Sequence, residues 1–227
     1  MALFDTENED YWIPLADIMT GLMLIFLLIA ASYIIIYNKE IQTLKEHYTE
    51  SSQLLMMNLT LSQQIRNELI QEFNTDTLKW QATIESQDIS ISFDAPEVLF
   101  ATGSADLKTE FKEILQEFLP RYLQLLQEHS NDITEIRING FSSNFWGKMH
   151  DPEQIYLLNM QLSQQRAVNV LNYLHQITPA DKDKEYLRNY FTANGFSSSH
   201  ALVQTGREAD PAKTQRVEFR VILKGQL

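Results

Sequence analysis

The chain has no cysteine, and only 7 of its 227 residues are glycine and 6 are proline. The absence of cysteine excludes disulfides, thiolate chemistry and cysteine-based metal sites. The five histidines are scattered and show neither of the spacings, HxxxH or HExxH, that place metal ligands on one helix face. No nucleophile–base pair and no phosphate-binding loop stands out. We therefore expect no enzymatic activity, no metal site and no cofactor.

Basic residues are also scarce: 18 Lys and Arg stand against 30 Asp and Glu, for a net charge of -12. A chain of this charge is repelled by polyphosphate, which excludes nucleic acid as a partner.

One long apolar run is present, from Ile18 to Tyr37, and it contains no charged residue. Its 20 residues, at about 1.5 Å per residue, span the roughly 30 Å hydrocarbon layer of a membrane. A cleaved signal peptide fits poorly, because the run is long, its N-terminal flank is acidic and no small-x-small cleavage site ends it. The sequence predicts an N-terminal tail over 1–10 and a single transmembrane helix over 11–37.

An acidic residue, Asp17, lies at the start of this span. If Tyr11 marks the interface, Asp17 lies roughly 9 Å deep, where a carboxylate is costly and therefore suggests a function. Thr20, one turn on, is a candidate hydrogen-bonding partner of the carboxylate, although threonine is also common in helix packing. In the alternative interpretation, Pro14 is the first helical residue and Asp17 complements the helix dipole at the headgroups.

Between Leu22 and Ala95 there is no glycine or proline, which favours a long helical connector over 38–87. Its apolar residues recur at loosely helical spacing, but the register drifts. A dimer-forming stalk, a plug-like amphipathic helix and a spacer packed on the next domain all remain open. We expect the helix to end at Asn74-Thr75-Asp76.

The remaining residues, 88–227, alternate strand and helix patterns. Strands are predicted over 89–93, 133–138 and 217–223, and amphipathic helices over 107–126 and 157–177. This order indicates an α/β fold, a two-layer α+β sandwich, preceded by the transmembrane helix and the connector.

Three segments of this region resemble the OmpA-like peptidoglycan-binding domain, in the same order. They are Val98–Leu107, which resembles its first strand and helix entry, Asn159–Val170, which matches N-x-x-L-S-x-x-R-A-x-x-V, and Gln215–Phe219, which resembles the closing R-V-E strand. The resemblance implies peptidoglycan as the ligand.

The second segment supplies the candidate ligand residues Asn159, Leu162 and Arg166, spaced for one helix face. A guanidinium there can hold a stem-peptide carboxylate through two hydrogen bonds. The alternatives are a solvated surface role for Arg166 and a core role for Leu162.

The sequence departs from the family at one position. The family has an aspartate that helps to hold the stem-peptide amine, and Ser143 stands in its place here. Ser143 is therefore only a weak candidate, and Asp151 or Glu153 is a possible replacement for the missing carboxylate.

The segment Trp12–Met23, WIPLADIMTGLM, resembles the P-x-A-D-x-M-T segment of MotB-type stator subunits. Its acidic tail and W-I-x-x-A-D pattern are most similar to the stator-like ZorB family of Zorya anti-phage defence systems. The resemblance implies that Asp17 carries ions, H⁺ or possibly Na⁺, and that a homodimer sits within a pentamer of a MotA-like membrane subunit. A flagellar MotB-type stator and a passive tether between membrane and wall remain alternatives.

The resemblance also implies an orientation, with the N-terminus in the cytoplasm and the C-terminal domain in the periplasm of a bacterial inner-membrane protein surrounded by lipid. Charge alone favours the opposite orientation, because Lys39 and Lys45 follow the helix and the first ten residues contain no Lys or Arg.

Overall fold

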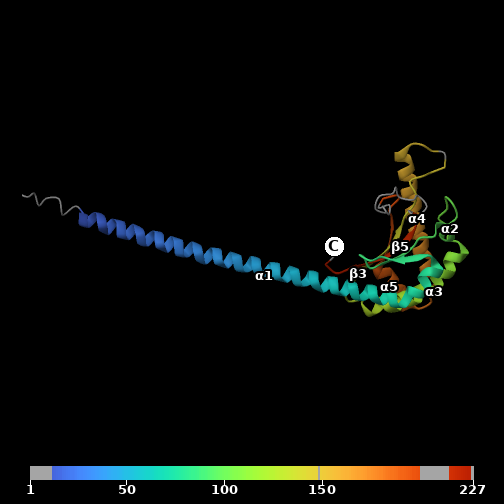
Figure 1. Cartoon of the computed structure of the whole chain (residues 1–227), viewed down its shortest axis with the longest axis horizontal. Helices are drawn as coiled ribbons and strands as arrows, with labels where there is room; N and C mark the ends of the chain where they lie inside the picture. The colour runs from blue at the N-terminus through green and yellow to red at the C-terminus, as the bar shows by residue number, and fades with distance from the viewer. Residues whose placement is uncertain (1–11, 148, 200–214, 226–227) are drawn as a thin grey trace, which may run out of the picture. The chain divides into compact units, whose positions relative to one another are not determined.

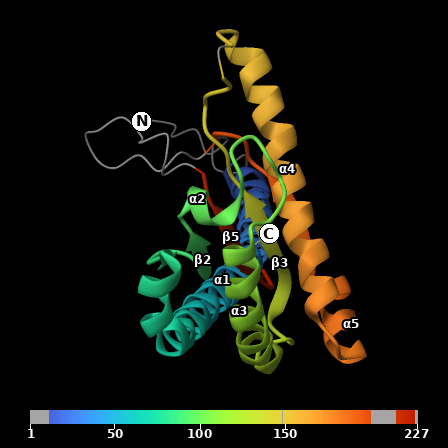
Figure 2. The ribbon, with the colours of Figure 1, turned by 90° about the vertical axis from the view of Figure 1, so that its right-hand side faces the viewer.

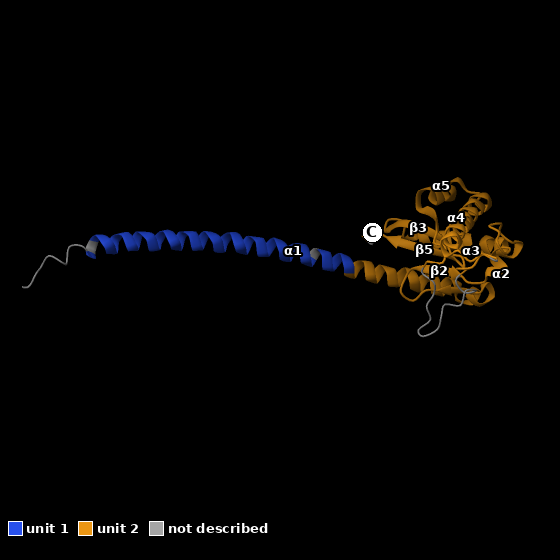
Figure 3. Ribbon diagram, turned by 90° about the horizontal axis from the view of Figure 1, so that it is seen from above, with its two compact units in different colours: residues 1–55 blue, residues 56–227 orange. Residues whose placement is uncertain are grey.

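The computed structural model describes residues 12–147, 149–199 and 215–225. The chain divides into two compact units, residues 1–55 and residues 56–227, which Figure 3 colours separately. One helix, α1 (Trp12–Trp80), contributes residues to both units.

In the first unit, the described residues are all helical and their apolar side chains are exposed. The part of α1 that holds the apolar run is long and apolar enough to cross a membrane, and none of its most apolar window is buried within the chain. The exposed side chains include Ile25, Phe26 and Leu28, at more than half of their surface. Such a surface needs an apolar solvent or other helices around it.

The second unit contains a five-stranded mixed sheet in the order β1-β2-β5-β3-β4. Figure 1 labels two of its strands, β3 and β5. Its strands are β1 (Ala82–Ile84), β2 (Ser90–Phe93), β3 (Ile133–Gly140), β4 (Phe191–Gly195) and β5 (Val217–Leu223). Strands β3 and β4 are parallel, and the other neighbours are antiparallel. The helices are α2 (Pro96–Leu99), α3 (Thr109–Glu128), α4 (Pro152–Ile177) and α5 (Asp181–Tyr190). The expected α/β fold is confirmed.

The sheet has one apolar face and one polar face. On β5, Val217, Phe219 and Val221 are buried, and the alternate residues Glu218 and Arg220 form an ion pair at 2.8 Å. This alternation is what the strand geometry requires when helices cover one face only.

The last part of α1 belongs to the core of this unit. Ile65, Leu69 and Phe73 are completely buried, and Trp80 is 1% exposed. The Phe73 ring lies 5.3 Å from that of Phe118 on α3. From Ile65 onward, α1 is therefore packed on the sheet domain, as in the third alternative for the connector.

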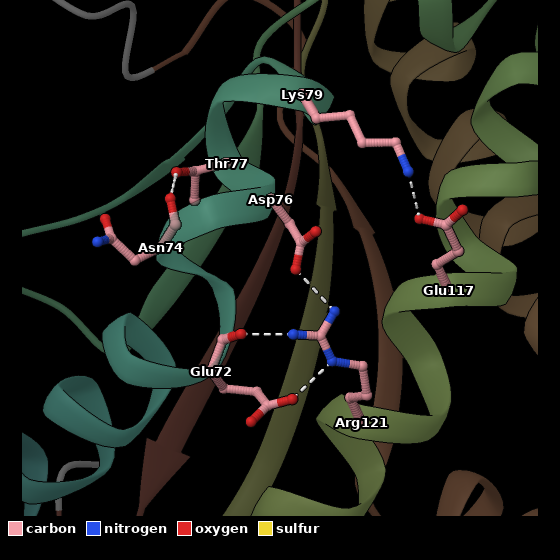
Figure 4. Close-up of polar contacts among 7 residues, drawn as sticks. All are labelled: Glu72, Asn74, Asp76, Thr77, Lys79, Glu117 and Arg121. Atoms are coloured by element: carbon pink, nitrogen blue, oxygen red, sulfur yellow. Dashed lines mark hydrogen bonds and ion pairs between the residues drawn. The ribbon is translucent and has the colours of Figure 1, made fainter.

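The α1 end is also joined to α3 by polar contacts (Figure 4). Arg121 of α3 donates to the Glu72 carboxylate at 2.6 Å and to the Asp76 carboxylate at 2.7 Å. Its guanidinium lies 4.7 Å from the Phe73 ring centroid. Because Asp76 is held in this way, the helix passes through the expected end at residues 74–76 and stops at Trp80.

Two other local expectations are wrong. Val98 and Leu99, in the segment that resembles the family's first strand, lie in the short helix α2, because Pro96 starts a helical turn in which their amides donate to Ala95 O. Phe100 follows the helix and forms an isolated β-bridge with Leu107. Helix α4 begins five residues before the expected 157, because Asp151 caps it and Pro152 occupies the first turn.

Two glycines let α4 lie directly against the sheet. A Cβ on Gly140 would be 2.2 Å from Ser163 O, and a Cβ on Gly195 would be 2.5 Å from Gln164 N. The absence of side chains at the ends of β3 and β4 therefore fixes the distance between the sheet and the middle of α4.

We predict that Arg121→Ala lowers the free energy of unfolding of the second unit by about 1 kcal/mol, since it removes a two-carboxylate network and a cation–π contact. Thermal unfolding of the detergent-solubilised chain, followed by near-UV circular dichroism, measures this. Lys79→Ala is the matched control, because the Lys79–Glu117 pair at 2.7 Å is a single exposed contact, and it should leave the melting temperature nearly unchanged. Equal effects of the two substitutions would contradict the network.

We also predict that Gly140→Ala destabilises the same unit by about 1–3 kcal/mol, because the new methyl group overlaps the backbone of α4. The same melting experiment tests this. Gly21→Ala, where no atom lies within 4 Å, is the control. An unchanged melting temperature for Gly140→Ala would show that α4 moves away freely.

Candidate functional site

The two residues predicted to handle ions lie one turn apart on α1. The Thr20 hydroxyl donates to Ala16 O at 2.7 Å, so its proton faces the helix backbone and not the Asp17 carboxylate. The lone pairs of Thr20 remain as acceptors for a cation. Gly21 follows directly and has no atom within 4 Å of a Cβ position, which leaves room for a close neighbour beside Asp17.

In the second unit, Arg166 is the residue at which the three OmpA-like segments meet. Its Nε donates to Ser104 O at 3.0 Å and its Nη1 donates to the Gln215 side chain at 3.4 Å. Its guanidinium lies 4.7 Å from the centroid of the Phe100 ring. Phe100 and Ser104 come from the first segment and Gln215 from the third. One side chain of α4 thus joins parts of the chain far apart in sequence.

Arg166 is only 3% exposed, and its contacts with the described residues are with neutral groups. Burial lowers the pKa of Arg166 to about 10. Among the described residues, none of the ion pairs includes Arg166. A buried cation that lacks a counter-ion is costly, and a carboxylate bound to its remaining N–H groups would relieve that cost.

Asn159 and Ser143, both predicted ligand residues, hold a loop in this structure. Asn159 Nδ2 donates to Phe145 O at 3.3 Å and to Ile155 O at 3.0 Å. The Ser143 hydroxyl donates to the same Phe145 O at 3.2 Å. Asn159 is 2% exposed, so its amide positions the loop before α4. Leu162 is half-buried, between the core and solvent roles considered for it.

Asp151 and Glu153, the possible replacements for the missing aspartate, lie at the start of α4. The Asp151 carboxylate accepts hydrogen bonds from the amides of Glu153 and Gln154, as the cap of α4. Asp151 precedes Arg166 by fifteen residues, or about 22 Å along the helix, and Glu153 lies nearly as far away. Both carboxylates are therefore distant from Arg166 along α4, and a role for either of them in place of the family's aspartate stays a prediction.

Sequence reasoning missed Phe100, Ser104 and Gln215 as partners of Arg166, although all three lie within the segments that carry the resemblance. Asn169 was missed as well, and its amide donates to Ala105 O at 2.8 Å. The signal was the spacing: Arg166 and Asn169 are three residues apart and so lie on one face of α4. That face holds residues 104–105, which follow the turn at residues 102–103.

Comparisons with known proteins agree with this geometry. Residues 99–184 match the OmpA family. The structure is similar to a crystal structure of a putative MotB-like protein from Desulfovibrio vulgaris, with a TM-score of 0.52, 22% identity, and coverage of 76% of this chain and 97% of that one. At that identity the likeness shows a shared fold.

A much more extensive match is to the Zorya protein ZorB of Escherichia coli. The two chains are 37% identical over 226 residues, which cover 98% of this chain and 92% of the relative. The match includes both the apolar part of α1 and the sheet domain. The chain therefore belongs to the ZorB family, the MotB-like proteins with an OmpA-like domain.

Proposed function

We propose that this protein is the stator-like subunit of an ion-driven motor in the bacterial inner membrane, anchored to peptidoglycan and acting in anti-phage defence. The observation that carries the proposal is the position of Asp17, a carboxylate on the apolar part of α1 in a chain of the ZorB family. In this proposal the chain is a homodimer within a pentamer of a MotA-like membrane subunit. It is not an enzyme and needs no cofactor.

Asp17 is the ion-carrying group in this scheme. A carboxylate near the membrane edge can exchange a proton with water on one side and with a partner subunit on the other. Thr20 contributes an oxygen acceptor one turn away, and Gly21 allows the partner helix to approach. A proton requires one carboxylate, whereas Na⁺ requires several oxygen ligands, so we favour H⁺ and keep Na⁺ as the alternative.

The second unit is the wall anchor. Its Arg166 guanidinium is a buried cation whose described partners are neutral, which suits the carboxylate of a peptidoglycan stem peptide. With the wall outside the inner membrane, the second unit is periplasmic and the N-terminus cytoplasmic. Torque on the partner ring then acts against a dimer that the wall holds.

A passive tether is the second candidate function. It requires only the OmpA-family domain and the apolar part of α1. A helix-dipole role for Asp17 does not support it, because α1 includes Trp12 and its first turn contains no acidic residue. The two functions differ in what they require of the charge on Asp17.

We predict that Asp17→Asn abolishes protection against phage while the chain still assembles with its MotA-like partner. The substitution keeps the size of the side chain and removes its charge. Efficiency of plating in cells that carry the complete defence gene cluster measures protection, and co-purification from membranes measures assembly. Thr20→Ser, which keeps the hydroxyl, is the control. Full protection by Asp17→Asn would establish the passive tether.

We predict that Arg166→Ala reduces co-sedimentation of the chain with purified peptidoglycan at least tenfold, because a charge-assisted pair is lost. Arg166→Lys should recover part of the binding, since it restores the charge but not the two-pronged geometry. Arg188→Ala, an exposed arginine on α5, is the control. Circular dichroism verifies that each variant is folded, and undiminished sedimentation of a folded Arg166→Ala variant would refute the anchor site.

A further inference from the structure

The loop before α4 and the first turns of α4 carry apolar side chains that the anchor site does not use. Among the described residues that follow α1, the large hydrophobic side chains classed as exposed are Phe145, Tyr156 and Leu157, at 63%, 42% and 55% of their surface. Figure 2 shows this loop and the first turns of α4 at one end of the domain, beyond the strands. Exposed apolar groups gathered in this way mark a contact surface.

The loop is fixed in place and does not simply trail from the domain. Phe145 O accepts the two hydrogen bonds from Asn159 and Ser143 described above. The amide of Met149 donates to Trp146 O at 3.0 Å, which closes a turn around Gly147, whose φ is +53°. Phe145 and Trp146 are thus presented by a loop that is held before any ligand arrives.

The described residues that line a cleft beside the loop are apolar or carry neutral amides. A shallow cleft of about 770 Å³ runs along this part of α4. Its described lining residues are Trp146, Leu158, Met160, Gln161, Leu162, Gln164 and Gln165. Aromatic and aliphatic groups with a few neutral hydrogen-bonding groups suit a ligand that has both apolar faces and hydroxyls. Sugar rings have this character, whereas a phosphate or a charged headgroup would lack a counter-ion among these residues.

The position along α4 relates the cleft to the anchor site. Leu158, Leu162 and Arg166 follow at intervals of four residues and lie along one side of the helix. Leu158 is eight residues, or about 12 Å, from Arg166. In peptidoglycan the peptide is joined to the glycan strand, and its free carboxylates lie two to four residues from the sugar, or roughly 7–14 Å for an extended chain. A peptide carboxylate on Arg166 therefore brings the sugar to which the peptide is joined within reach of Trp146 and Leu162.

We propose that Phe145 and Trp146, with Leu158 and Leu162 of α4, form a surface that binds the sugar rings of the glycan strand whose stem peptide is held at Arg166. This inference rests on the proposed wall-anchoring function. The two sites together bind the peptide and the glycan to which it is joined, so the domain recognises intact wall polymer better than free peptide.

The test compares a stem tetrapeptide with the same tetrapeptide joined to its disaccharide, by isothermal titration of the detergent-solubilised full chain. We expect the disaccharide-peptide to bind about tenfold more tightly than the peptide, as the loss of one or two buried aromatic contacts typically corresponds to such a factor. The double variant F145S/W146S should bind both ligands equally, with the affinity for the peptide unchanged. Leu78→Ser, which alters an 88% exposed leucine on α1, is the control and should keep the tenfold preference.

The outcomes separate this inference from the proposed function. Wild-type chain that binds the peptide with no preference for the disaccharide-peptide, or a double variant that keeps the preference, overturns the sugar surface and leaves the Arg166 anchor intact. Failure of the wild-type chain to bind either ligand overturns the anchor itself. If the double variant has a different sedimentation coefficient from the wild-type chain in the absence of sugar, the surface is a contact between two copies of the chain. If the double variant loses binding to zwitterionic lipid vesicles, the surface is a lipid contact. Either result overturns the proposal.

Discussion

The packing of the end of α1 into the core of the sheet domain is the constraint on which the second unit depends. Phe73 and Trp80 come from this helix, Phe93 from β2, Phe118 from α3 and Phe219 from β5, and their rings lie within 5.1–6.3 Å of neighbours in the group. Without α1 the apolar face of β2 and α3 would be open to water. The C-terminal part of the connector, from Ile65 to Trp80, is therefore part of the folded domain.

The same helix also explains why the connector was hard to interpret from sequence. Ile65, Leu69 and Phe73 recur every four residues, which indicates a helix with one buried face but does not say what covers it. The partners, Phe118 and Arg121, come about fifty residues later and become neighbours only through the sheet topology. By contrast, β2, β3 and β5 were predicted well, because their alternation reflects a local requirement. β4 was missed because it is only five residues long and contains one large apolar residue, Phe191, and because its partner β3 lies far away in sequence.

The candidate site shows the same division between local and distant information. The motif at Asn159–Val170 suggested Asn159 and Arg166 as ligand residues, and the position after β3 suggested Ser143. In the structure the side chains of Asn159 and Ser143 position a loop, because their hydrogen bonds go to Phe145 O. A sequence motif records that a residue type is required at a position. It does not distinguish a group that touches a ligand from one that orients the chain around it.

In the proposed function, the burial of Arg166 among neutral described partners has a consequence for the stability of the protein in the cell. An anion that binds this guanidinium only in the folded domain shifts the folding equilibrium toward the native state, by an amount that grows with ligand concentration relative to the dissociation constant. If the chain binds peptidoglycan as proposed, bound chains are harder for proteases to unfold than unbound chains. Attachment would thus decide which copies persist, so that subunits accumulate where the wall can hold them.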